Sequence, residues 1–511
     1  MKLPVFILTQ NNKLESHTLS IVFLLIAALF LSITSGILAA YGNLHLLIAL
    51  LGVYGLLFVL IVPPSWVVWM IFFSAFLITG PSAYFVRFTQ IQWLTVLISA
   101  ALFLPVIFNL LRGRKNILST QFSINLFLPA AFIFLAILSS IINQSQLGDF
   151  VNASRHYFFM WPLLLVFAFG LVQADTFTKL WKALLIVAIL QLPMALYQYF
   201  YVARQDARMS PWDAVIGTFQ GNIDGGGDGA SMSMMLLITI ITSIALWRER
   251  QLKLNWMILV LISGIGTMVL AETKTMVMLL PVLMGIYYRK ELTQKPLETI
   301  TVMIGAFLLM STILTAYESI HYETSATFKS NSQVNSAYDS IINAITPNPG
   351  EDSAHVGRVT LLVNWWNSNV VHGEVHSTVF GHGIGAVHSS KIQRGKIASL
   401  YEYKIAKTTS VILLWEMGIL GHLIFLMILL FGAKASADAA DAAKAEYIPS
   451  LHRVLLRIGA ISLILLVITL PYSNFHLFSI PTQFLMMLML GQALYWSNFI
   501  KSTNASKLLY K

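Results

Sequence analysis

Basic residues beside apolar segments are the residues of this sequence best suited to bind an anionic group. Lys274 stands in a short turn between two apolar segments, Arg358 opens the stretch GRVTLLVNWW, and Lys407 directly precedes another apolar segment. A charge so close to an apolar slab is costly and often functional, and arginine matches phosphate oxygens with two parallel hydrogen bonds. By position alone, Lys274 is equally well explained as a snorkelling residue, and Arg358 is better explained as a solvated loop residue.

Histidines are concentrated in one long polar stretch, 318–407, which holds six of the twelve: His321, His355, His372, His376, His382 and His388. The spacing of His372 and His376 allows one metal ion to be bound if the segment is helical, but it matches no closed zinc motif. We therefore expect no metal site. A histidine that acts as a general base is favoured instead, and spacing alone does not distinguish which one.

Acidic residues are rare enough to consider singly. Glu416 falls inside an apolar segment, where a carboxyl group is costly unless it is paired, so we expect a structural partner for it. Asp224 and Asp228 belong to the glycine-rich stretch 217–230, which lacks the Gly-Lys-Ser/Thr end of a phosphate-binding loop. We expect them to be solvated acids of a flexible turn rather than ligands of a divalent cation.

Composition identifies the class of protein. Of 511 residues, 57% are hydrophobic and only 11% are charged, whereas a soluble protein carries about 25% charged residues. This excludes a soluble enzyme, a disordered chain and a nucleic-acid-binding domain. The absence of cysteine excludes disulfides and thiolate metal sites. We conclude that the chain is a polytopic membrane protein.

The predicted fold is all-α, with about fourteen membrane spans and one large loop on the outer side. A span needs about 20 mostly apolar residues, and the predicted spans are 19–40, 44–62, 65–79, 93–111, 122–142, 157–173, 177–202, 229–247, 254–271, 275–288, 297–317, 408–432, 454–471 and 475–497. The positive-inside rule applied to Arg112, Arg114 and Lys115 puts both termini in the cytoplasm. No cleavable signal peptide is expected.

Three parts follow from this topology: eleven spans in 1–317, a large outer loop in 318–407, and three spans in 408–511. The loop is the longest segment outside the predicted membrane, and loops of this length are usually functional. We expect 433–446 to continue the preceding span as a helix or to act as a linker.

Several motifs, in this order along the chain, resemble the O-antigen ligase and O-antigen polymerase family of bacterial envelope glycosyltransferases. These are GTFQGN at 217–222, Glu272-Thr273-Lys274 between two spans, Arg358 before Trp365, FGHGIG at 380–385, and Lys407-Thr408 followed by nine residues and Gly418-Ile419-Leu420-Gly421. The resemblance covers about 210–430. It implies a GT-C-like fold in the bacterial inner membrane and a glycosyltransferase that needs neither cofactor nor metal.

Two departures from the family pattern bear on the reaction. Lys274 stands where the family has arginine, and Lys407 stands where the ligases have the histidine proposed as their base. The second change favours a polymerase, which joins a glycan from a polyprenyl-pyrophosphate donor to the hydroxyl of an acceptor sugar at the periplasmic face. The close alternative is a ligase that transfers the glycan to lipid A core or to protein.

The resemblance also implies roles for particular residues. Lys274 and Arg358 would hold the departing pyrophosphate, with Lys407 as a third cation. The base stays open among His382, His376 and a neutral Lys407. Substrate-binding roles fall to Arg204 and Arg208, which would guide the anionic head group, and to Trp365 and Trp366, which would stack on sugars.

Partners and alternatives complete the prediction. The expected partners are a polyprenyl-pyrophosphate-linked oligosaccharide, membrane lipid and a protein that regulates chain length, with no nucleic acid. A flippase of lipid-linked oligosaccharides is the alternative from another class, although transporters often show two related halves and short loops. A membrane protein with a purely structural role would leave the outer cations without a purpose.

Overall fold

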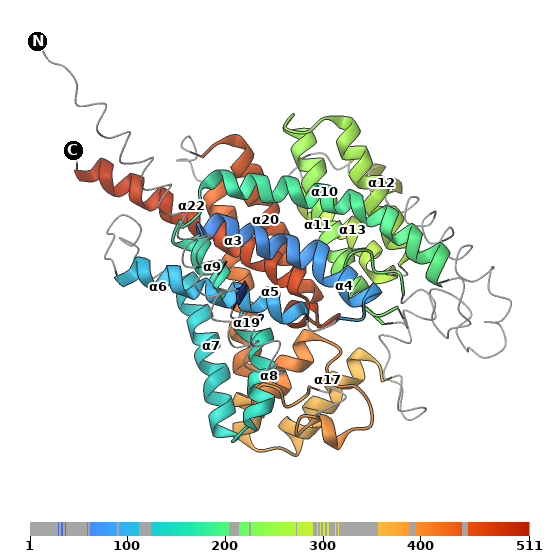
Figure 1. Ribbon diagram of the computed structural model, residues 1–511, viewed down its shortest axis with the longest axis vertical. Coiled ribbons are helices and arrows are strands. Elements are labelled where there is room, and N and C mark those ends of the chain that lie inside the picture. The colour runs from blue at the N-terminus through green and yellow to red at the C-terminus, as the bar shows by residue number, and fades with distance from the viewer. Residues whose placement is uncertain are drawn as a thin grey trace, which may run out of the picture. The chain divides into compact units, whose positions relative to one another are not determined.

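The chain forms two compact units, Met1–Pro63 and Pro64–Lys511. A computed structural model describes 62–88, 91–111, 124–203, 214–223, 226–271, 273–289, 356–388, 394–441, 448–509 and a few single residues between 29 and 315. Nearly all of them belong to the second unit, whose helices are shown in Figure 1. Predicted spans 19–40, 44–62 and 297–317 lie outside these ranges except for isolated residues.

All regular elements in the described ranges are helical. Seven helical segments there are long and apolar enough to cross a membrane: Pro64–Phe85, Ile91–Leu111, Ile124–Ile142, Ala174–Ala203, Gly229–Arg248, Thr409–Asp441 and Ser450–Thr469. The predicted class of helical membrane protein therefore agrees with the structure, with seven candidate spans in the described part. Two shorter helices, α12 (Leu254–Leu270) and α13 (Lys274–Tyr287), correspond to predicted spans.

The predicted span 157–173 is not one continuous helix in the structure. The segment contains the end of α8 (Leu147–Tyr157) and α9 (Trp161–Ala168), which has only 8 residues and is too short to cross a membrane. Pro162 lies in the first turn of α9, where proline is tolerated because its missing N–H needs no partner. Gly170, at φ +64°, follows the end of that helix.

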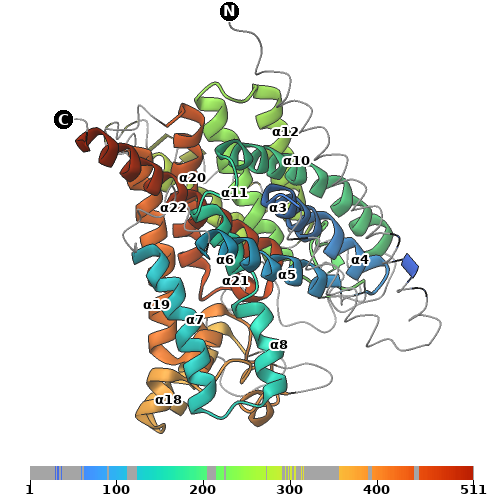
Figure 2. The ribbon, with the colours of Figure 1, turned by 60° about the vertical axis from the view of Figure 1, so that its left-hand side comes forward.

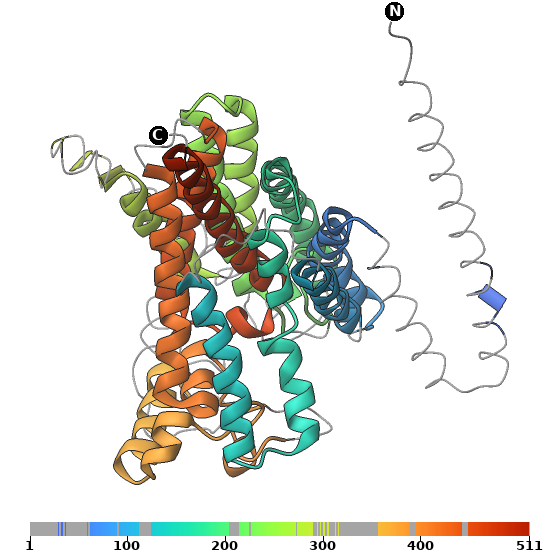
Figure 3. The same ribbon diagram turned by 90° about the vertical axis from the view of Figure 1, so that its left-hand side faces the viewer.

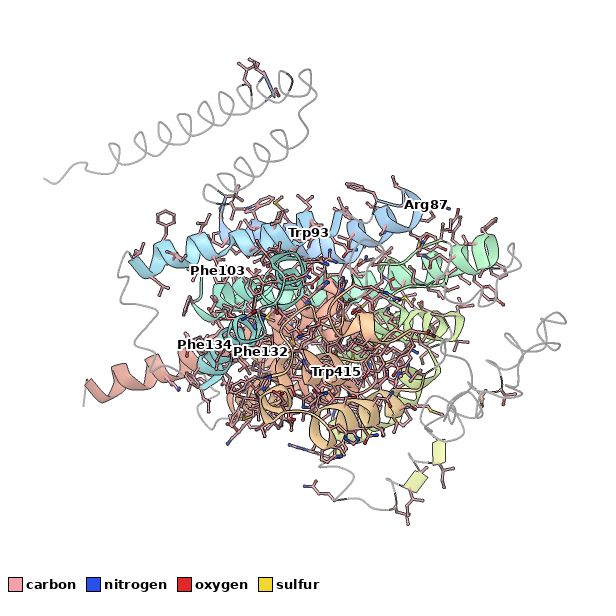
Figure 4. The ribbon with its side chains drawn as sticks, turned by 90° about the horizontal axis from the view of Figure 1, so that it is seen from below. Arg87, Trp93, Phe103, Phe132, Phe134 and Trp415 are labelled. Carbon is pink, nitrogen blue, oxygen red and sulfur yellow. The ribbon has the colours of Figure 1, made fainter. Side chains whose placement is uncertain are left out.

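The helix α7 (Ile124–Ile142) shows how the core is built from the apolar sequence. Its Phe132 is fully buried and lies 5.4 Å from Phe425 and 6.0 Å from Tyr157 between ring centroids. Phe134 on the same helix is 66% exposed, and both are labelled in Figure 4. The exposed face of this apolar helix is what a lipid-facing surface requires.

The predicted span 408–432 lies within α19 (Thr409–Asp441), but the helix folds back on itself. Gly418 has φ +66° and ψ −168°, which no helix allows. The side chains of Ser410 and His422 are 3.1 Å apart, although twelve residues of continuous helix would span about 18 Å. The segments 409–417 and 419–441 therefore form a helical hairpin. The expected extension of this span continues as helix to Asp441.

The glycine-rich turn Gly381–Gly385 crosses this hairpin at its bend. Carbonyl groups that precede a helix break have no helical partner, and here His382 N donates to Trp415 O at 2.8 Å and Gly383 N donates to Glu416 O at 3.0 Å. The hydroxyl oxygen of Ser139 in α7 lies 2.9 Å from the same Glu416 carbonyl. Glycines 381, 383 and 385 all have positive φ, which glycine adopts without a steric cost.

Contacts tie these segments into one assembly around α19. Its long part runs beside α7 in Figure 3, and α20 (Ser450–Thr469) packs along it. Figure 2 shows α7, α8 and α18 (Val375–Phe380) around the end of the hairpin. The part of the predicted outer loop that the structure describes therefore packs against the helices as one compact unit.

Replacing Gly418 by alanine tests the bend. A Cβ there would lie 2.3 Å from the Val379 carbonyl oxygen, and its backbone conformation costs about 1–3 kcal/mol for any residue but glycine. We expect Gly418→Ala to lower the melting temperature of the detergent-purified protein strongly. Gly285→Ala is the matched control, since a Cβ there meets nothing within 4 Å. Equal stability of the two variants would contradict the hairpin.

Candidate anion-binding site

A short turn between α20 and α22 (Ile480–Leu509) joins the elements that carry the candidate site. We call residues 472–479 the α21 turn, after the helix α21 (Phe475–Phe478) within it. Its His476 is completely buried, with Nδ1 2.9 Å from Thr409 Oγ1 and Nε2 2.9 Å from the Leu466 carbonyl oxygen. Burial lowers the pKa of His476 to about 3. The ring is therefore a neutral structural anchor for the turn.

Two of the predicted cations meet on one side of the α21 turn. Arg358 begins α17 (Arg358–Trp366), and its guanidinium carbon lies 4.5 Å from the centre of the Tyr472 ring. Lys407 Nζ donates to the carbonyl of Val356 at 2.9 Å. Burial, followed by the positive charges of Arg358 and Lys404, lowers the pKa of Lys407. The structure thus brings Arg358 and Lys407 together, half-buried.

At Phe478 of the same turn, α8 contributes an arginine and a histidine that the sequence analysis missed. Arg155 Nε donates to His156 Nε2 at 2.9 Å, and its guanidinium lies 5.1 Å from the centre of the Trp93 ring, labelled in Figure 4. His156 packs 4.3 Å from Phe478, and His388 stacks on the same ring at 5.9 Å. Burial, Arg155 and His388 lower the pKa of His156, which therefore stays neutral.

We call four basic residues the cation cluster: Arg155, Arg358, Lys404 and Lys407. Their positive charges act on the pKa values of shared neighbours. Arg155 and Lys404 both lower the pKa of His388, after burial. In the described part of the chain, no carboxylate forms an ion pair with any of the four. Arg155, Arg358 and Lys407 are partly buried, whereas Lys404 is exposed. Partly buried charges of one sign repel one another in a medium of low dielectric, and a bound anion relieves that repulsion.

A carboxyl group reaches the same turn from the glycine-rich segment. Asp228 directly precedes α11 (Gly229–Arg248) and bonds to the hydroxyl groups of Ser479 and Ser231. Burial raises its pKa to about 6 although these hydrogen bonds oppose the change. Asp228 is therefore not the freely solvated acid that the sequence analysis predicted. A carboxyl group with this pKa can accept a proton near neutral pH.

The remaining predicted cations lie partly or wholly outside the described structure. α13 begins at Lys274, whose side chain is not among those described. The preceding Thr273 accepts a hydrogen bond from Ser233 in the first turn of α11, at 2.7 Å. Lys274 is therefore anchored near Asp228 by its backbone. Arg204, Arg208 and Asp224 lie outside the described residues.

The predicted histidines form a separate group. His382 Nε2 lies 2.8 Å from Asn369 Oδ1, and burial, followed by Lys396 and His376, lowers its pKa to about 4. Asn369 follows Arg358 by eleven residues of helical chain, or about 16 Å. His376 is half-exposed and pairs with Glu374 at 2.9 Å. The structure therefore places His382 beside Asn369, away from the start of α17 where Arg358 lies.

The two predicted sugar-stacking residues behave differently. Trp365 is only 4% exposed, and its indole N–H donates to the Leu414 carbonyl at 2.9 Å. Trp365 therefore holds α17 against the helical hairpin, and its ring has no exposed face on which a sugar could stack. Trp366 is 53% exposed and keeps a free surface.

Glu416 has the structural partners that its position predicts. The hydroxyl of Tyr157 donates to Glu416 Oε2 at 2.6 Å, and Val387 N donates to Oε1 at 3.2 Å. The carboxyl group therefore connects α8, the segment after the FGHGIG turn and the bend of α19. Its side chain is 3% exposed, which agrees with a role in holding the site elements together.

Two glutamines that the sequence analysis did not identify accept hydrogen bonds from the backbone of the GTFQGN stretch. Gln198 of α10 (Ala174–Gln198) accepts from Ile216 N and Gly217 N at 2.9 and 2.7 Å, and Gln191 accepts from Thr218 N at 2.8 Å. Both glutamines are completely buried. Irregular backbone inside a membrane protein needs such partners. These bonds fix the path of the chain that leads to Asp228.

Some of the missed residues carried a sequence signal. Arg155 lies in a short predicted outer turn, where the positive-inside rule makes any basic residue unusual. Tyr472 and Lys404 carried no comparable signal, because only the fold shows which residues face them. No protein-family model matches the chain, and no curated protein matches its sequence.

The pH dependence of stability tests the environment of His382. Because the folded-state pKa of about 4 lies below the usual 6.5, the unfolded state binds more protons between these values. Stability should therefore fall as the pH drops from about 6.5 to 4. We expect His382→Gln to lose less melting temperature over this range than wild type, with the half-exposed His376→Gln as control. Parallel curves for His382→Gln and wild type would contradict the assignment.

Proposed function

We propose that the protein is a polysaccharide polymerase of the membrane, which transfers a glycan from a polyprenyl-pyrophosphate donor to a hydroxyl group of an acceptor sugar. The observation that carries the proposal is the cation cluster, which has no acidic ion-pair partner in the described part and contacts the α21 turn, to which Asp228 also bonds. Pyrophosphate is the anion whose departure such a cluster assists. The motif order across 210–430 supports the same class.

The proposed reaction assigns one task to the cations and another to a base. The bond between the anomeric carbon of the donor and the pyrophosphate oxygen breaks, and its electron pair leaves with the pyrophosphate. The oxygen of the acceptor hydroxyl forms the new bond to that carbon, and its proton passes to a base. Arg358 and Lys407 stabilise the departing charge, while Lys274 stays a further candidate cation.

Asp228 is the base that the geometry favours over the predicted histidines. His382 and His376 lie near Asn369 and Glu374, one helix length from Arg358. Lys407 donates to a backbone carbonyl, and its proposed role beside the departing charge requires the protonated ammonium form, which cannot accept a proton. Among these candidates, Asp228 combines contact with the α21 turn and a pKa of about 6, which suits proton transfer near neutral pH.

The family resemblance also suggests the fold, the topology and the location that we propose for the protein. They are a GT-C-like arrangement of about fourteen spans, cytoplasmic termini and a site at the periplasmic face of the bacterial inner membrane. A ligase would use the same donor chemistry with lipid A core or protein as the acceptor. A flippase would move the donor across the membrane with its pyrophosphate bond intact.

Removal of single cations tests the donor site. With a polyprenyl-pyrophosphate oligosaccharide and the detergent-purified protein, we expect Arg358→Ala and Lys407→Ala to slow release of polyprenyl pyrophosphate by about 10²–10³. Lys179→Ala should keep the wild-type rate, because Lys179 is exposed and pairs with Asp175 within α10. Longer lipid-linked glycans identify a polymerase, and transfer to another acceptor identifies a ligase. Transport into vesicles without bond cleavage would overturn the enzyme proposal.

The pH profile of the same reaction tests Asp228. A base must be unprotonated, so a pKa of about 6 predicts that kcat/KM falls below pH 6. Asp228→Asn should reduce the rate by about 10²–10⁴ and remove this acidic limb from the residual activity. An Asp228→Asn variant that retains the wild-type rate and profile would exclude this residue as the base.

A further inference from the structure

A cavity of about 400 Å³ lies at the ends of the helices opposite to the candidate site. It is bounded by the last turn of α11, the end of α13, the long part of α19 and the first turns of α20. Its charged lining residues are Arg248, Glu249, Arg289, Lys434, Asp441 and Arg457. Asp441 accepts a hydrogen bond from Arg457 Nη2 at 3.2 Å, so one of the two acids already has a cationic partner. The cavity therefore keeps an excess of positive charge.

The charges and the apolar residues of this cavity occupy different depths. The guanidinium of Arg248 lies over the ring of Tyr288, 5.3 Å from its centre, at the ends of α11 and α13. Ile464, which also lines the cavity, follows Arg457 by seven residues of α20, or about 10 Å of helix. Leu430 precedes Asp441 by eleven residues of α19, or about 16 Å. Most charges of the cavity therefore lie toward the helix ends and its apolar residues Leu430 and Ile464 lie toward the middle of the helices, with Lys434 one turn from Leu430.

We propose that this cavity binds an anionic phospholipid, with its phosphate among the cations and an acyl chain along the apolar wall. Arginine and lysine side chains bind phosphate oxygens through charge-assisted hydrogen bonds. Basic pockets between membrane helices are suited to anionic head groups. The positive-inside rule puts the same helix ends, with Arg248, Arg289 and Lys434, on the cytoplasmic side, where such lipids are available. The site is separate from the one proposed for catalysis.

Two kinds of variant distinguish the contribution of the charges from that of the cavity volume. Arg289→Gln combined with Lys434→Gln removes two exposed cations from the mouth. Ala437→Phe narrows the cavity and leaves every charge in place. Lys253→Gln is the matched control, because this exposed lysine belongs to the predicted cytoplasmic turn before α12 but does not line the cavity.

The test measures binding of phosphatidylglycerol to the delipidated, full-length protein in detergent, by native mass spectrometry and thermal stabilisation. We expect wild type and Lys253→Gln to bind phosphatidylglycerol at least tenfold more tightly than phosphatidylcholine with the same chains. Both cavity variants should lose at least tenfold in affinity. Equal affinity for the two lipids, undiminished binding by both variants, or the same stabilisation by inorganic phosphate alone would overturn the proposal.

Discussion

The contact between the bend of α19 and the glycine-rich turn is the constraint on which the rest of the structure depends. Gly418 reverses the helix, and the carbonyls of Trp415 and Glu416 that lose their helical partners accept from His382 N and Gly383 N instead. Backbones can approach so closely only because glycine has no Cβ. This contact fixes the start of α19, with Lys407 just before it, against the segment that carries His388.

Hydrogen bonds between polar groups buried among the apolar helices also hold the structure together. Gln191 and Gln198 satisfy the backbone of the GTFQGN stretch, and Glu416 joins Tyr157 to Val387 N. Each group has partners, as buried polar groups require. The cation cluster differs, since no ion pair with a carboxylate occupies its members in the described part. That contrast distinguishes groups that hold the fold from groups available for an anion.

Much of the architecture follows from local sequence, whereas the site depends on contacts between distant segments. Apolar runs predict helices such as α11 and α20 well, because burial in lipid requires a helix of sufficient length. The predicted span 157–173 is interrupted at residues 158–160, between α8 and α9, and the predicted span 408–432 contains a hairpin because Gly418 reverses the chain. Arg358 and Lys407 were identified from their types and positions. Asp228 was misjudged because its hydrogen bond to Ser479 joins residues that are some 250 positions apart in the sequence.

The central claim is that pyrophosphate binds in the cation cluster. The most direct measurement is a cryo-electron microscopy structure of the full-length protein in lipid nanodiscs with polyprenyl pyrophosphate bound. The account predicts diphosphate density in contact with Arg358 and Lys407, beside the α21 turn to which Asp228 also bonds. Diphosphate density at another place, including the cavity near Lys434, or no density in the cluster at saturating ligand, would contradict it.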